Sequence, residues 1–111
     1  MSMTSMALDH LVYTLAARPE VQCVILFGSR ARGDATARSD IDLAIEAPQA
    51  TRRQWLELTL LVEEAPTLLP IDLVRLEEAP PALRTRILAE GKTLYERAQS
   101  GAKPATSRTG A

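Results

Sequence analysis

The chain has 111 residues, a formal net charge of −1 at pH 7 and 46% hydrophobic residues, which predicts one small domain with a modest core. The near-neutral charge does not indicate broad nucleic-acid binding, and no apolar run reaches the length of a membrane span. We therefore expect a cytoplasmic protein. A single cysteine, Cys23, excludes an internal disulfide, and a single histidine, His10, argues against a histidine-based metal site or a Ser-His-Asp triad.

The first predicted elements are a helix and a strand. Apolar residues at helical spacing predict an amphipathic helix that ends before Pro19: Leu8, Leu11, Val12 and Leu15. The following segment, 21–27 (VQCVILF), is apolar and rich in β-branched residues. We expect it to be a strand buried on both faces, in which Cys23 is a core thiol.

The turn after this strand has the features of an anion-binding loop. Gly28 allows a sharp turn and the close approach of a ligand. Ser29 would cap a short helix, whose first N–H groups bind anions readily. Arg30, Arg32 and Arg38 add positive charge around the loop, and the guanidinium group matches phosphate well. The turn therefore predicts a phosphate site.

Acidic residues follow on two further predicted strands. In the segment 40–45 (DIDLAI) apolar residues alternate with Asp40 and Asp42, so both carboxylates should point to one face of a half-buried strand. Another short strand, 70–74 (PIDLV), carries Asp72. If the two strands pair, three carboxylates converge, and a divalent cation such as Mg²⁺ would relieve their repulsion. One carboxylate could also accept the proton of an acceptor hydroxyl.

Two more helices and an edge segment complete the predicted domain. Thr51 and Gln54 have the capping-box spacing, and one helix face follows them: Trp55, Leu58 and Val62. A last helix would begin at Pro80-Pro81 and end at Gly91, with three residues facing inward: Leu83, Ile87 and Leu88. Residues 93–95 (TLY) would form an edge strand or a docking segment. These elements predict an α/β fold, with a small mixed β-sheet packed with helices.

The end of the chain differs in composition. Residues 97–111 are mostly small or polar and include no acidic residue, so we expect a disordered tail there and a domain spanning residues 1–96.

The pattern Gly28-Ser29, ten residues, Asp40-x-Asp42 resembles the signature of the DNA polymerase β-like nucleotidyltransferase superfamily. More narrowly, GSRARGDATARSDIDL and the later IDLVRLEEAPPALRTRILAEGKTLYE resemble the minimal nucleotidyltransferases called MNT domains. The resemblance extends over residues 10–96. It implies a polymerase β-like nucleotidyltransferase fold, Mg²⁺ as cofactor, ATP as nucleotide donor and a HEPN-domain toxin as partner.

The resemblance also implies roles for individual residues. Gly28 and Ser29 would hold the triphosphate, and Arg32 would touch phosphate or fasten the loop. The three acidic positions would bind Mg²⁺: Asp40, Asp42 and Asp72. The last of them would also activate the acceptor hydroxyl. Position 30 departs from the pattern, because relatives often have an aromatic residue where this chain has Arg30.

Two functions of different classes remain open. The first is a Mg²⁺-dependent nucleotidyltransferase that transfers AMP from ATP to a hydroxyl, by resemblance a tyrosine, of a HEPN-type toxin, and so acts as its antitoxin. The second is a non-catalytic antitoxin that neutralises its partner by stoichiometric binding. The three intact acidic residues favour the first, because an idle site would tolerate their loss. A small-molecule transferase ranks third, because no segment is expected to form an acceptor-binding domain.

Overall fold

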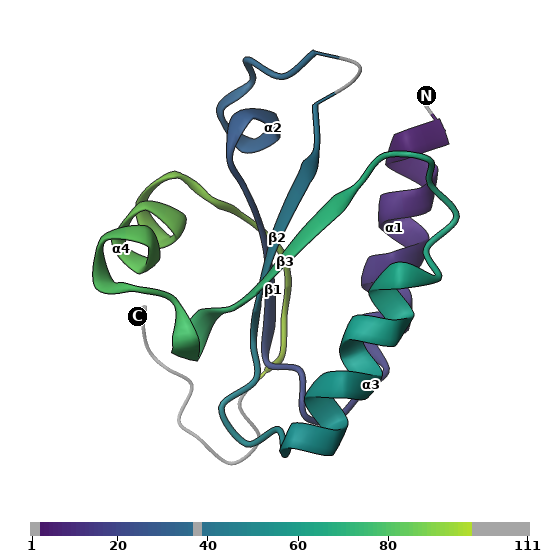
Figure 1. Ribbon diagram of the computed structural model, residues 1–111, viewed down its shortest axis with the longest axis vertical. Coiled ribbons are helices and arrows are strands. Elements are labelled where there is room, and N and C mark those ends of the chain that lie inside the picture. The colour runs from purple at the N-terminus through teal and green to yellow at the C-terminus, as the bar shows by residue number, and fades with distance from the viewer. Residues whose placement is uncertain (1–2, 37–38, 99–111) are drawn as a thin grey trace.

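The structure is a computed structural model that describes residues 3–36 and 39–98 (Figure 1). The helices are α1 (Met3–Ala16), α2 (Ser29–Arg32), α3 (Arg52–Glu63) and α4 (Pro81–Glu90), with a 3₁₀ turn η1 (Leu76–Glu78). The strands are β1 (Cys23–Phe27), β2 (Ile41–Glu46), β3 (Ile71–Arg75) and β4 (Lys92–Glu96). Within these residues, no helix combines the length and apolar character needed to cross a membrane.

The strands form one mixed sheet in the order β3-β2-β1-β4. β1 is antiparallel to β2 and to β4, whereas β2 and β3 are parallel. A parallel pair needs a crossover connection, and α3 lies in that connection. The predicted mixed sheet is therefore confirmed. The segment 93–95 is part of the edge strand β4. Of its two predicted alternatives, an edge strand or a docking segment, the edge strand is therefore confirmed.

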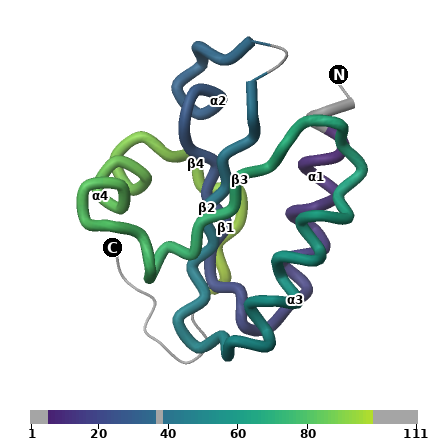
Figure 2. The backbone as a smooth tube through the Cα atoms, in the orientation of Figure 1, coloured from purple at the N-terminus to yellow at the C-terminus, as the bar shows by residue number. Residues whose placement is uncertain are grey.

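Helices cover both faces of the sheet. In the edge-on view of Figures 1 and 2, α1 and α3 lie on one side of the strands and α4 lies on the other. The short helix α2 stands beyond one end of the sheet, where β1 ends and β2 begins. This arrangement leaves one end of the sheet bordered by α2 and α4, and Asp42 of β2 and Asp72 of β3 lie toward that end.

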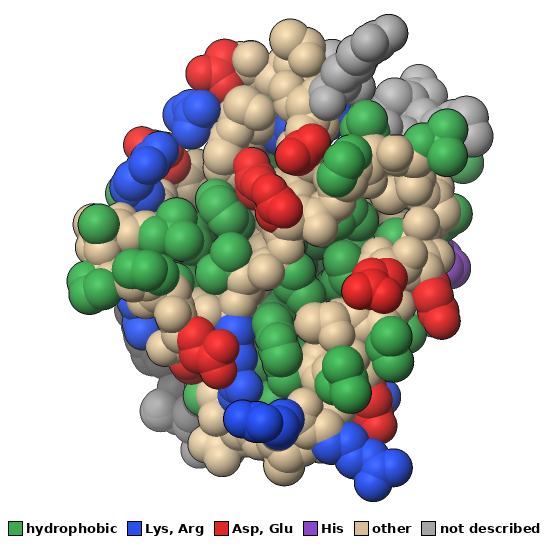
Figure 3. Space-filling model, viewed as in Figure 1, with side chains coloured by type: hydrophobic (Ala, Val, Ile, Leu, Met, Phe, Trp, Pro, Cys, Tyr) green, Lys and Arg blue, Asp and Glu red, His purple; other side chains and the backbone are tan. Residues whose placement is uncertain are grey.

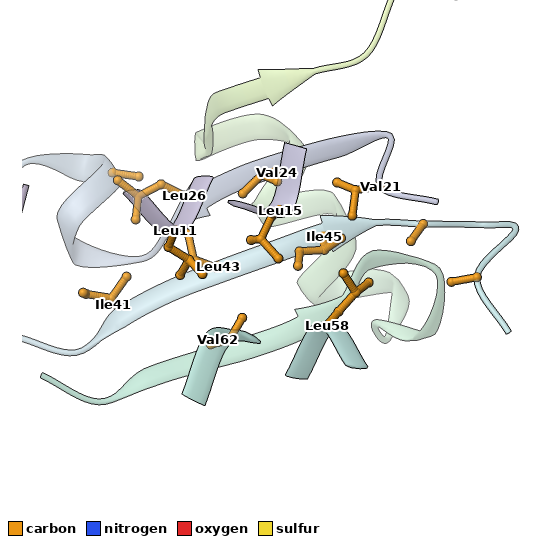
Figure 4. Packing of buried hydrophobic residues seen from close by; sticks show 13 residues of the cluster. Leu11, Leu15, Val21, Val24, Leu26, Ile41, Leu43, Ile45, Leu58 and Val62 are labelled. Carbon is orange, nitrogen blue, oxygen red and sulfur yellow. The ribbon is translucent and has the colours of Figure 1, made fainter. Parts of the chain in front are cut away.

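Alternate residues of the central strands enter two separate apolar clusters. The cluster under α1 and α3 includes Leu43 and Ile45 of β2, packed against Leu15 and Leu58 (Figure 4). The smaller cluster lies on the α4 face: Cys23, Ile25, Ala44, Leu76 and Ile87. β1 therefore contributes to both faces, as predicted for a doubly buried strand, and its thiol is buried in the core. Even-numbered positions of β2 point to the α4 face, because side chains alternate along a strand.

The predictions for α1, α3 and α4 are confirmed except at Leu88. Thr51 Oγ1 accepts from the Gln54 N–H at 3.1 Å and the Thr51 N–H donates to Gln54 Oε1 at 2.9 Å, which completes the capping box. In α4, Ile87 is buried and Leu83 packs beside it, but Leu88 is 58% exposed. The inward orientation predicted for Leu88 is wrong, because successive residues of a helix are rotated by about 100° and Ile87 already faces the sheet.

Arg97 anchors the end of the described chain. Its guanidinium donates to the carbonyl oxygens of Ala16, Arg18 and Val21 at 3.1, 2.8 and 3.0 Å. Arg97 therefore packs with the domain, although it was predicted to begin the tail. Residues 99–111 lie outside the described residues, and their assignment as a tail stays a prediction.

Candidate active site

Asp42 and Asp72 lie side by side on the α4 face. The two residues are directly paired in the parallel ladder of β2 and β3, so their side chains leave the sheet in the same direction, about 5 Å apart at the backbone. At this separation the charge of Asp72 acts directly on the Asp42 carboxyl. The sequence predicted that carboxylates would converge if these two strands paired, and the two strands do pair.

The surroundings of Asp42 disfavour its ionised form. Burial raises the pKa of the Asp42 carboxyl, and the negative charges of Asp72 and Asp40 raise it further, while Arg32 acts in the opposite direction. Holding like charges together in this way costs free energy, which a bound cation would recover. Such perturbed carboxyl groups are typical of catalytic and metal-binding sites.

Asp40 lies next to this pair, immediately before β2 begins. It acts on Asp42 through its charge. Across residues 3–36 and 39–98, no three acidic, histidine or cysteine side chains are arranged to hold a metal ion by themselves. The carboxylates nevertheless form a set of hard oxygen donors that fits Mg²⁺, which takes one or two protein carboxylates together with phosphate and water oxygens.

The turn at Gly28 touches the Asp42 carboxylate. Phe27 pairs with Asp42 across the antiparallel ladder of β1 and β2, which brings the next residue, Gly28, over the carboxyl group. Gly28 has φ 76°, and a Cβ atom added there would overlap Asp42 Oδ2. Both observations require glycine at this position.

Gly28, and not Ser29, occupies the N-cap position of α2. The helix begins at Ser29, and the Gly28 carbonyl accepts from the N–H groups of Ala31 and Arg32, both at 3.1 Å. The predicted capping role of Ser29 is therefore wrong, since the sharp turn is made one residue earlier by the glycine. Ser29 is the first residue of the helix and directly follows the glycine that lies against Asp42.

Two of the loop arginines are held by protein groups. Arg30 donates two hydrogen bonds to the Ser39 carbonyl, from Nε at 3.2 Å and from an η nitrogen at 2.8 Å, and so ties α2 to the residue before Asp40. Arg32 pairs with Asp34 at 3.4 Å and with Glu90 of α4 at 3.7 Å. These ion pairs connect the loop to α4, which agrees with one of the two roles expected for Arg32, that of fastening the loop. Arg38 lies outside the described residues.

A pocket of about 210 Å³ opens between the Gly28 turn and α4. It is lined by Phe27, Gly28, Arg32, Asp42, Leu83, Arg86 and Glu90. Figure 3 shows basic and acidic side chains together on this flank of the molecule, between α2 and α4. Sequence reasoning missed Arg86 and Glu90. Their positions three and seven residues after Leu83 could have identified them, because this spacing places them on the same face of the helix as Leu83, which packs toward the sheet.

The sequence matches the model of one known protein family. Residues 9–100 match the family described as polymerase beta, nucleotidyltransferase. A solved structure of a protein proposed to be a minimal nucleotidyltransferase is 31% identical, with a TM-score of 0.56 and 80% of this chain and 91% of that chain covered. No curated protein matches the sequence.

Two toxin–antitoxin structures are also similar. One, a toxin–antitoxin with AMP-PNP, is 28% identical with a TM-score of 0.61, over 80% of this chain and 73% of that chain. The other is a tri-AMPylated HEPN toxin in complex with an MNT antitoxin from Shewanella oneidensis. The matched chain of this complex is 25% identical to the present sequence, with a TM-score of 0.59, over 86% of this chain and 74% of that chain. The fold and the family resemblance predicted from the sequence are confirmed, and the chain belongs to the polymerase beta nucleotidyltransferase family.

Proposed function

We propose that this protein transfers AMP from ATP, with Mg²⁺, to a hydroxyl group of a HEPN-type toxin and thereby acts as its antitoxin. The observation that carries this proposal is the direct pairing of Asp42 with Asp72 across β2 and β3, with the Asp42 carboxylate lying against the Gly28 turn. Paired carboxylates beside a glycine turn suit a magnesium nucleotide, because the metal joins protein carboxylates to phosphate oxygens. ATP and Mg²⁺ are both supplied in the cytoplasm, where we expect the protein to act.

Similarity to solved complexes supports the choice of nucleotide and partner. The related toxin–antitoxin structure contains AMP-PNP, an ATP analogue, and the related Shewanella oneidensis toxin is tri-AMPylated and bound to an MNT antitoxin. These properties belong to the related proteins, and the pairing of Asp42 with Asp72 in the present chain supports the same chemistry here. A tyrosine hydroxyl of the partner is the acceptor that we favour.

We assign the following roles within the site. Gly28 and Ser29 hold the triphosphate, and Arg32 keeps the loop against α4 while adding positive charge at the pocket wall. Asp42 and Asp72, with Asp40 beside them, would hold Mg²⁺ together with phosphate and water oxygens. Bound magnesium would neutralise phosphate charge and so favour attack on phosphorus.

The transfer forms one bond and breaks another. The acceptor oxygen bonds to the α-phosphorus of ATP, and the bond from that phosphorus to the pyrophosphate oxygen breaks. The proton of the acceptor hydroxyl passes to the Asp72 carboxylate, which faces the same space as Asp42 and can serve as general base.

The test is transfer of label from α-labelled ATP to the cognate toxin, with Mg²⁺, by the wild-type protein and by Asp42→Asn and Asp72→Asn. Label on the toxin that is lost in both variants supports the proposal. Asp9→Asn is a matched control, because Asp9 is exposed on α1, outside the site, and it should transfer AMP normally. A toxin that is neither labelled nor inhibited would overturn the proposal.

Non-catalytic neutralisation is the second candidate. It is favoured by large apolar side chains that the described residues leave exposed on and after α3: Leu56, Leu60 and Leu68. Exposed apolar residues of this kind are typical of partner surfaces. In the same experiment, a toxin that is inhibited without being labelled, by the wild-type protein and by Asp42→Asn alike, would establish this alternative.

A further inference from the structure

Among the described residues, Arg30, Arg32 and Arg86 lie in or next to the elements that form the proposed nucleotide site, and their side chains differ in the partners they bind. Arg30 is engaged with the Ser39 carbonyl, and Arg32 is paired with Asp34 and Glu90. Arg86 lines the pocket, and its side chain has no hydrogen bond or ion pair with any of residues 3–36 and 39–98. Its guanidinium donors are therefore available to a ligand.

The helix α4 directs Arg86 toward the pocket. Leu83 packs on the apolar cluster of this face, and Arg86 and Glu90 follow it at spacings that keep them on the same side of the helix. Glu90 is drawn toward Arg32 by their ion pair. Because Gly28, Arg32 and the Asp42 carboxyl line the pocket across from α4, a ligand in the pocket would meet Arg86 on one side and Asp42 on the other.

The ligand that suits these walls is a polyphosphate. The side bearing Asp42 would repel an anion that came without a cation, whereas a phosphate chain accompanied by Mg²⁺ satisfies both walls. Arginine offers several N–H donors in a planar fork that matches phosphate oxygens. We propose that Arg86 binds the β- and γ-phosphates of the nucleotide, the part that leaves as pyrophosphate. This inference rests on the proposed nucleotidyl transfer and names the residue that would receive its leaving group.

The test compares three ligands by calorimetry in the presence of Mg²⁺: pyrophosphate, ATP and AMP. For Arg86→Gln we expect binding of pyrophosphate and ATP to weaken about tenfold, as for loss of a hydrogen bond between charged groups, and binding of AMP to change less than about twofold. Arg86→Lys should retain part of the affinity, because it keeps the charge but not the fork.

Arg84→Gln is the matched control. Arg84 is an exposed arginine of the same helix, and its charge acts on Glu46, which lies at the far end of β2 from Asp42. Its substitution should leave the affinity for all three ligands unchanged. In transfer assays with the toxin, Arg86→Gln should raise the KM for ATP.

The outcomes separate this inference from the proposed function. Unchanged pyrophosphate affinity in Arg86→Gln, or a wild-type protein that does not bind pyrophosphate, would overturn the role of Arg86. An equal loss for AMP and pyrophosphate would also overturn it, because the contact would not be to the leaving group. If pyrophosphate binding depends on Arg86 while no AMP reaches the toxin, the proposed transfer fails and the phosphate site stands.

Discussion

At the scale of single residues, the closest constraint in the site is the contact between Gly28 and Asp42. Gly28 has φ 76°, and an added Cβ would overlap the Asp42 carboxylate. We expect Gly28→Ala to lower the free energy of unfolding by about 1–3 kcal/mol, through backbone strain and displacement of the carboxyl group. Nucleotide transfer should fall with it, because the turn and Asp42 would no longer fit together. Urea denaturation and the transfer assay measure the two effects.

Gly33 provides the control for this substitution. It has a similar φ of 88°, but an added Cβ would have nothing within 4 Å. Gly33→Ala should therefore cost only the strain of the left-handed conformation, on the order of 1 kcal/mol, and should leave Asp42 in place. If the two substitutions reduced stability and transfer equally, the contact with Asp42 would have no specific role.

Asp42→Asn should separate activity from stability. The substitution removes a negative charge that lies beside Asp72 and Asp40, so the repulsion in the metal-free protein falls while its transfer activity is lost. We expect the melting temperature to rise, by roughly 4–8 °C if the gain is about 1 kcal/mol. Thermal unfolding without added metal measures this. A lower melting temperature would mean that the Asp42 carboxylate stabilises the fold.

At the scale of elements, the sequence predicted the positions of the strands and helices better than their pairing and packing against one another. Apolar alternation identified β2, and the short segment 70–74, which carries Asp72, was predicted as the strand that proved to be β3. The pairing of Asp42 with Asp72 could only be stated as a condition, because a parallel pair is formed through a crossover and no local pattern sets its register. Arg86 was missed for the same reason: its role depends on where α4 lies relative to the Gly28 turn, which tertiary packing decides.

Arg97 shows how one side chain joins several elements. Its guanidinium donates to three carbonyl groups in and after α1, and its backbone N–H donates to the Gln22 carbonyl at 2.8 Å. Arg97→Ala should lower the free energy of unfolding by about 1.5–3 kcal/mol, because the carbonyl oxygens lose charged donors. Arg53→Ala, at a side chain that is 89% exposed and, within the described part of the chain, forms an ion pair with Glu57 alone, should cost less than about 0.5 kcal/mol. Urea denaturation midpoints compare the two variants.

At the scale of the whole molecule, acidic groups gather at both ends of the sheet, with different consequences. At the α2 end they meet beside the pocket, where the proposed magnesium nucleotide would compensate their charge. At the other end, burial raises the pKa of Glu46, as do the charges of Glu77 and, more weakly, Glu96, while Arg84 lowers it. No ligand is proposed for this second group. Its effect should therefore be visible in the pH dependence of stability of the protein alone.

Glu46→Gln tests this effect. Because the pKa of Glu46 is higher in the folded state than its usual value of 4.5, the folded protein binds this proton more tightly than the unfolded chain does. The resulting stabilisation is complete below the usual pKa and is lost as the pH rises through the raised one. The melting temperature of Glu46→Gln relative to wild type should therefore increase as the pH rises from about 4 and level off above the raised pKa. Glu63→Gln, at an exposed site on α3, should show no such trend. A constant difference across this range would mean that ionisation of Glu46 does not oppose folding.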